Sequence, residues 1–183
     1  MNHNKTKIND NVIRGKRILC QIKELGSCFG CCGNHFKSEE LVMAGIRKNN
    51  DFLKKMIEKH EGNWDSVFID MNTNYYGLRK CGVCYSLINL KEFPGIEKFY
   101  DIFPKESVES DKIFGCPMHP ILQGEEKRIC EIDHECKAYS LFKNWDVKKQ
   151  DSFIEFLKKK KLNVYNFSMG FDDNSFIDEF LKL

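Results

Sequence analysis

The chain has 183 residues, of which 42% are hydrophobic and 31% are charged, and its formal net charge is +2. This apolar content is enough for a buried core, which excludes a globally disordered chain. The net charge lacks the strong basic excess of proteins that bind phosphate backbones, so we expect no nucleic-acid partner.

The beginning of the chain is polar and charged, and we expect residues 1–12 to form a flexible tail. We find neither a signal-peptide core nor an apolar run of about 18 residues, which a membrane span needs. We therefore expect a cytoplasmic protein with no membrane partner. The length predicts a single domain over residues 1–183.

Two helices are expected in the first third of the chain. Apolar residues at helical spacing predict a helix over 13–25, which Gly26 would end. Ser38 is a favourable N-cap for a second helix that reaches Gly62. The polar stretch 48–51 is expected to divide this second helix into two.

The middle of the chain has the pattern of short strands. The apolar run at 65–70 predicts a buried strand, and 72–74 is rich in turn formers. Residues 75–90 then predict a hairpin with the Cys81–Cys84 segment at its tip. Pro and Gly punctuate residues 93–115, which we expect to be irregular.

The last third predicts helices around one strand. Ala138, Leu141, Phe142 and Trp145 share one helical face. Beyond them, residues 150–183 predict a helix–strand–helix extension. We therefore expect an α+β fold, mainly helical with a small β-hairpin or sheet, organised around Cys-rich metal sites.

The nine cysteines are the most informative feature of the sequence. Disulfides are rare in a reducing cytoplasm, where clustered cysteines more often bind metal or carry out redox chemistry. Cys20, within an apolar stretch, is expected to be only a small buried hydrophobic residue. The other eight cysteines are candidate metal ligands.

The Cys81–Cys84 segment has the C-x2-C spacing of a metal-binding turn. Both sulfurs of such a turn can face one ion, and Gly82 permits the tight backbone that this requires. A thioredoxin-like redox pair is the alternative, but that pair opens a helix in a βαβ unit. The strand-like residues after Cys84 favour the metal.

Two later segments carry further candidates. Cys116 and His119 are three residues apart and could clamp one metal, while the Cys116–Pro117 step is typical of iron–sulfur proteins. The alternative is an ordinary buried cysteine and a surface histidine.

Cys130, His134 and Cys136 form the last candidate group. Asp133 is a natural N-cap, which would put Cys136 in the first turn of the following helix and stabilise its thiolate there. His134 could equally be a solvent-facing residue at a helix start.

Four ligands complete a structural zinc site or an iron–sulfur cluster, so eight cysteines are enough for two tetrads. Cys31 and Cys32 are adjacent and cannot easily converge on one small ion beside Cys28, which favours two sites that share the loop, or one larger cluster. With two sites, one tetrad could join Cys28 and Cys31 to Cys81 and Cys84, and the other could join Cys32, Cys116, Cys130 and Cys136.

On Cys28, Cys31 and Cys32, followed by spaced later cysteines, the sequence resembles the zinc- or iron-chelating family named for its CxxCxxCC motif. This resemblance implies a small metal chelator or iron–sulfur protein. The chain departs from the motif, because Leu25 stands where the family has its first cysteine. The family's later Tyr, Arg-Pro and Cys stretch is also missing.

The predicted function is therefore a cytosolic protein that holds zinc in one or two Cys/His sites of mainly structural role. The alternative is an iron–sulfur protein that acts as an electron carrier or an oxidoreductase component. An enzyme with a nucleophilic cysteine is a third hypothesis, although no oxyanion hole is recognisable. The predicted metal ligands are Cys28, Cys31, Cys32, Cys81, Cys84, Cys116, Cys130, Cys136, His119 and His134.

Overall fold

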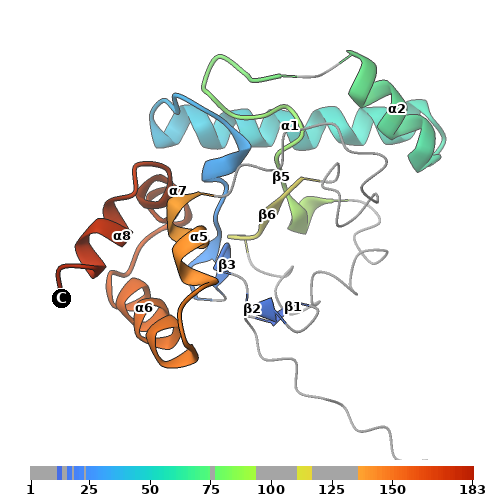
Figure 1. The fold of residues 1–183 in the computed structure, drawn as a ribbon. Coiled ribbons are helices and arrows are strands. Elements are labelled where there is room, and N and C mark those ends of the chain that lie inside the picture. The colour runs from blue at the N-terminus through green and yellow to red at the C-terminus, as the bar shows by residue number, and fades with distance from the viewer. Residues whose placement is uncertain are drawn as a thin grey trace, which may run out of the picture.

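The computed structural model describes residues 12–13, 16–17, 19–22, 24–74, 77–93, 111–116 and 136–183. Within these ranges the chain forms six α-helices and three two-stranded antiparallel sheets (Figure 1). The mainly helical α+β class is confirmed at this level. Apart from Val12, the predicted tail lies outside the described residues, as does most of the predicted irregular stretch 93–115.

The three sheets are short, with two residues in each strand. Their strands are β1 (Val12–Ile13) paired with β2 (Lys16–Arg17), β3 (Gln21–Ile22) paired with β4 (Gly26–Ser27), and β5 (Ile88–Asn89) paired with β6 (Phe114–Gly115).

The predicted helix over 13–25 is wrong, because this segment contributes to two hairpins. The β3–β4 hairpin closes at Gly26, whose φ of 103° is a conformation that favours glycine. The apolar residues at positions 19, 22 and 25 are nevertheless all buried. A tight hairpin therefore buries the residues whose spacing predicted a helix.

Helix α1 (Glu39–Lys59) is continuous, so the predicted division at 48–51 is also wrong. Ser38 occupies the N-cap position, although its side chain makes no capping hydrogen bond. Asn49 and Asn50, which suggested a break, are buried. Their side-chain amides bind the backbone of a neighbouring segment instead of interrupting the helix.

Helix α2 (Trp64–Asn74) replaces both the strand predicted at 65–70 and the turn predicted at 72–74. The side chain of Asn63 caps the start of the helix by accepting a hydrogen bond from the Ser66 N–H at 3.1 Å. Val67 and Met71, one turn apart, are buried on the face that packs with α1 residues such as Leu53.

The C-terminal part is entirely helical within the described residues. Its helices are α5 (Lys137–Phe142), α6 (Val147–Lys159), α7 (Val164–Asp172) and α8 (Ser175–Phe180). The predicted strand at 162–167 is wrong, because the Asn163 side chain caps α7 by accepting from the Asn166 N–H at 2.8 Å. The other predicted helices of this region are confirmed, with shorter bounds for α5 and α8.

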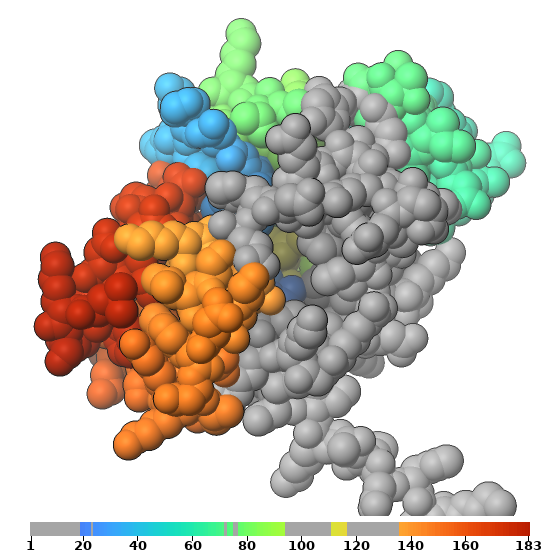
Figure 2. All heavy atoms as spheres, viewed as in Figure 1, coloured from blue at the N-terminus to red at the C-terminus, as the bar shows by residue number. Residues whose placement is uncertain are grey.

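The helices are arranged in two groups. Figure 1 shows α1 and α2 side by side along one edge and α5–α8 gathered at another. Figure 2 shows the same separation on the molecular surface. No helix of the described ranges is both long enough and apolar enough to cross a membrane.

Three apolar clusters form the core. One lies beneath α1 and α2, a second joins the β3–β4 hairpin to α5–α8, and a third connects them. The third cluster contains Phe29, Val42, Val83, Phe114 and Val164, from five separate segments. The segment that carries Cys28, Cys31 and Cys32 therefore lies where the two groups of helices meet.

Candidate metal centre

Eight of the nine cysteines are among the described residues, and all eight are free thiols. Cys31 is exposed and the other seven are half-buried, so none of them is buried like a core residue. Cys130, His119 and His134 lie outside the described residues.

The β3–β4 hairpin places Cys20 opposite Cys28. Strand pairing matches Gln21 with Ser27, and the Cys28 N–H continues this register by donating to the Cys20 carbonyl at 2.7 Å. Residues directly opposite each other in an antiparallel pair point to the same face. The residue that the sequence predicts to be only a small buried hydrophobic one therefore lies opposite another cysteine.

The double cysteine lies in a short 3-10 helix, η1 (Gly30–Cys32), that α7 supports. The preceding Phe29 is fully buried, and its N–H donates to the Ser168 hydroxyl of α7 at 3.0 Å. A 3-10 helix has three residues per turn, so Cys31 and Cys32 point in directions about 120° apart. A hydrogen bond nevertheless joins the two thiols.

The Cys81–Cys84 segment lies at a tight turn, which confirms the predicted hairpin tip. The Arg79 N–H donates to the Val83 carbonyl at 2.7 Å, and the Gly82 N–H donates to the Arg79 carbonyl at 2.8 Å. Gly82 has a φ of 94°, as the C-x2-C turn requires.

This turn pairs with the double-cysteine loop. Gly33 and Val83 form an antiparallel bridge, and the Cys84 N–H donates to the Cys32 carbonyl at 2.8 Å. Cys32 and Cys84 are therefore opposite each other, as Cys20 and Cys28 are in the first hairpin. Two separate backbone pairings therefore involve this loop. One sets Cys28 opposite Cys20, and the other sets Cys32 opposite Cys84.

Cys81 and Cys116 lie near the Cys32–Cys84 pair. A Cβ atom on Gly45 of α1 would be 2.6 Å from the Cys81 sulfur, so the absence of a side chain there makes room for the thiol. When the β5–β6 register is continued by one residue, Cys116 lies opposite Leu87. Leu87 follows Cys84 by three residues, so Cys116 lies opposite the segment that continues from the C-x2-C turn.

Asn49 of α1 holds the backbone around Cys84. Its side-chain NH₂ donates to the carbonyls of Cys84 at 2.9 Å and Leu87 at 2.6 Å, and its side-chain oxygen accepts from Arg79 Nε at 2.5 Å. Sequence reasoning missed this residue. The available signal was a pair of asparagines on the buried side of an amphipathic helix.

The electrostatics indicate which further sulfurs lie near each other. Burial, together with smaller contributions from the charges of Cys31 and Cys136, raises the pKa of Cys20 to about 12. Burial likewise raises the pKa of Cys28, with added contributions from Cys20, Cys31 and Cys136. Cys20, Cys28, Cys31 and Cys136 are thus close enough to influence one another.

The second group surrounds Cys32. A hydrogen bond with the Cys31 thiol and burial raise the pKa of Cys32, and the charges of Cys31, Cys116 and Cys84 add to the effect. The same thiol contact lowers the pKa of Cys31 to about 7. The two groups therefore meet at the adjacent residues Cys31 and Cys32.

This arrangement differs from the predicted tetrads. Cys28 and Cys31 lie with Cys20 and Cys136 rather than with the Cys81–Cys84 turn, which instead pairs with Cys32. Cys136 also differs locally, because it is itself the N-cap residue of α5 rather than part of its first turn.

Among the described residues, no three His, Cys, Asp or Glu side chains converge closely enough to hold one ion as they stand. Metal binding would require thiols to turn toward a common centre. The donor set itself fits a soft metal, because thiolates are the preferred ligands of structural zinc and of iron–sulfur clusters.

Comparison with known proteins finds no matching family model, no matching curated protein and no matching solved structure. The resemblance to the CxxCxxCC family stays a prediction.

Proposed function

We propose that this chain is a zinc-binding protein whose metal has a structural role. The ligands that we assign are Cys32, Cys81, Cys84 and Cys116. Four thiolates form a closed tetrahedral site, which leaves no open position for a substrate. Zinc bound in this way contributes directly to the stability of the fold.

The observation that carries this proposal is the backbone pairing of two cysteine segments far apart in the sequence. The hydrogen bond from the Cys84 N–H to the Cys32 carbonyl, at 2.8 Å, sets two thiol-bearing residues opposite each other. Cys81 lies across the tight turn from Cys84. All three side chains pack against the same apolar cluster.

Two further hydrogen bonds hold Cys84 in place. The Ser86 N–H donates to the Cys84 sulfur at 3.4 Å. Asn49 fixes the Cys84 carbonyl and thereby the backbone from which the thiol projects.

An iron–sulfur cluster is the alternative occupant of the same four thiolates. The residue after Cys116 is Pro117, and a Cys-Pro step recurs beside such clusters. The two occupants differ in colour and in elemental composition, so one preparation distinguishes them.

The test is elemental analysis of the full chain purified without air, together with two variants. We expect colourless protein with bound zinc, loss of zinc from this site in Cys84→Ser, and retention in the neighbouring control Ser86→Ala. Iron with inorganic sulfide in a brown solution would establish the cluster instead. Folded protein that binds neither metal would contradict the proposal.

A further inference from the structure

We infer that the chain holds a second, separate four-thiolate zinc site formed by Cys20, Cys28, Cys31 and Cys136. This inference rests on the proposed function and extends it to a ligand set that the sequence did not predict. It gives Cys20 the role of a metal ligand.

The first two ligands come from one hairpin. In the register that pairs Gln21 with Ser27, Cys20 and Cys28 are opposite each other on the same face as Ile22. Ile22 is fully buried in the cluster formed with α5–α8, so this face turns toward those helices. The Ser27 N–H donates to the Lys112 carbonyl at 2.9 Å, which ties the hairpin to the segment preceding β6.

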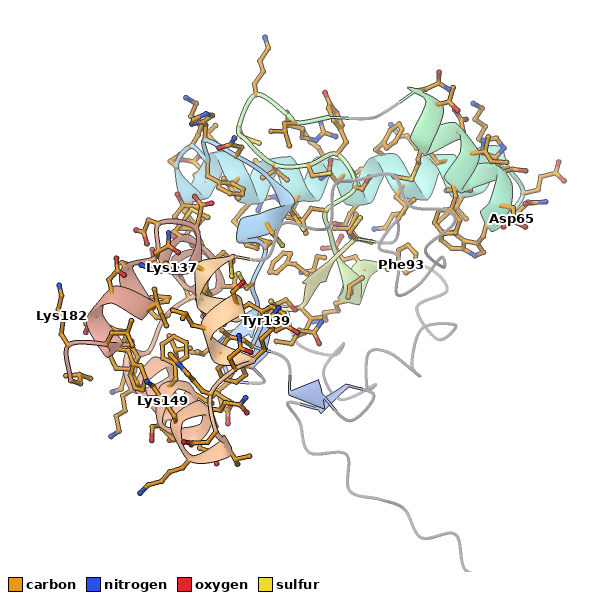
Figure 3. The ribbon with its side chains drawn as sticks, in the orientation of Figure 1. Asp65, Phe93, Lys137, Tyr139, Lys149 and Lys182 are labelled. Atoms are coloured by element: carbon orange, nitrogen blue, oxygen red, sulfur yellow. The ribbon has the colours of Figure 1, made fainter. Side chains whose placement is uncertain are left out.

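The third ligand approaches from the C-terminal helices. Cys136 immediately precedes α5 and packs against the same apolar cluster as Cys28. The Tyr139 N–H donates to its sulfur at 3.4 Å, a contact that favours the thiolate form. Figure 3 shows Tyr139 on the part of α5 that lies beside the β3–β4 hairpin. Two chain segments more than a hundred residues apart thus present thiols to one region.

The fourth ligand is Cys31. It directly precedes Cys32, which is a ligand of the first proposed site. Its direction differs by about 120° from that of Cys32, which pairs with Cys84. Cys31 follows Cys28 by three residues, in the 3-10 turn that the Cys32 N–H closes by donating to the Phe29 carbonyl at 2.8 Å. Cys31 is exposed, which gives an ion a route to this group from solvent.

The composition of the group favours an ion over simple packing. A cysteine that serves only as a small hydrophobic residue is typically fully buried, whereas Cys31 is exposed. Four neighbouring thiols repel one another when deprotonated, and a divalent cation offsets that repulsion. Four thiolates are also the complete ligand set of a structural zinc ion.

The test uses zinc stoichiometry and the alkylation rate of each cysteine in the full chain. We expect two zinc ions in the wild type and one in Cys20→Ser and in Cys136→Ser. The control Ser27→Ala, on the opposite face of the hairpin, should retain both. In the wild type, zinc should slow alkylation of Cys20 as strongly as that of Cys81.

Alkylation of the wild type decides the question even where a variant does not fold. If Cys20 is alkylated equally fast with zinc and after chelation while Cys81 is protected, the second site is wrong and the proposed function stands. If zinc protects none of the cysteines, both the second site and the proposed function are overturned.

Discussion

Gly45 determines whether the Cys81 thiol can keep its place against α1. A Cβ atom there would be 2.6 Å from the sulfur, which must then move away. Alanine is also a better helix former than glycine by about 1 kcal/mol. Gly45→Ala should therefore leave the zinc-free protein at least as stable while weakening zinc binding by about 10–100-fold, as changes beside metal ligands do.

A competition titration against a chromophoric chelator measures the zinc affinity, and thermal unfolding measures the stability. Lys48→Ala, on the exposed face of the same helix, is the matched control and should not change the affinity. Wild-type zinc affinity in Gly45→Ala would show that Cys81 is not a ligand.

Substitutions of Asn49 and Asn50 separate two effects, the loss of correctly positioned metal ligands and a general loss of stability. Asn49→Leu leaves the Cys84 and Leu87 carbonyls without their donor, at an expected cost of about 2–3 kcal/mol in the free energy of unfolding. Asn50→Leu removes a similar clamp on Asn89, away from the cysteine turn. We expect comparable destabilisation in urea but weaker zinc binding only for Asn49→Leu. Equal loss of zinc affinity in both variants would show that Asn49 has no specific positioning role.

The ionisation of Asp70 makes the free energy of unfolding depend on pH. Its carboxylate accepts hydrogen bonds from Lys59 at 2.7 Å and Asn74 at 2.7 Å and lies 2.8 Å from His60 Nε2, and these contacts hold the pKa of Asp70 well below its usual range. The unfolded-state pKa is about 3.9, so the stabilisation is complete above that pH and is lost as pH falls below it.

Melting temperatures of the wild type and Asp70→Asn between about pH 6 and pH 3 test this dependence. The wild type should be more stable at the upper end, and the difference should shrink below about pH 4. Acid release of zinc affects both proteins and leaves the comparison intact. A difference that is constant over this range would refute the role of the carboxylate.

At the scale of elements, α7 supports the double-cysteine loop. The Ser168 hydroxyl accepts from the Phe29 N–H at 3.0 Å and donates to the Val164 carbonyl at 2.9 Å. Ser168→Ala leaves a buried N–H without its acceptor, so we expect a loss of about 1–3 kcal/mol and faster amide exchange in residues 28–34. Destabilisation without faster exchange in this segment would argue against α7 as the support of the loop.

Two of the wrong element predictions share one physical origin. Short apolar runs, such as 65–70 and 162–167, fit both a buried strand and a helix. In both cases an asparagine directly before the helix, Asn63 or Asn163, supplies the cap that decides for the helix. The opposite error occurs at positions 19, 22 and 25, where the apolar spacing predicts a helix. Gly26 instead allows that segment to fold into a hairpin.

At the scale of the whole molecule, the cysteines connect the two groups of helices. Cys28 and Cys136 pack against the cluster of α5–α8, while Cys32 and Cys84 pack against the cluster that includes α1. Zinc in both groups would therefore add further links between parts of the chain that meet at the third apolar cluster. This position explains how metal could stabilise the fold as a whole.

The sequence alone allowed the C-x2-C turn and the importance of the double cysteine to be predicted, but not the grouping of the cysteines. The grouping depends on strand register, and a shift of one residue would turn Cys20 or Cys84 to the other face. From the sequence, Cys20 is predicted to be only a small hydrophobic residue within an apolar stretch. Only the hairpin register places it beside Cys28.

Native mass spectrometry of the full chain, purified without air, tests the central claim most directly. Our account predicts a folded protein whose mass exceeds that of the chain by two zinc ions, less the protons that they displace. Chelation should remove both ions and lower the melting temperature, because zinc binding contributes to folding. A folded protein with the mass of the metal-free chain, and with the same melting temperature after chelation, would contradict the account.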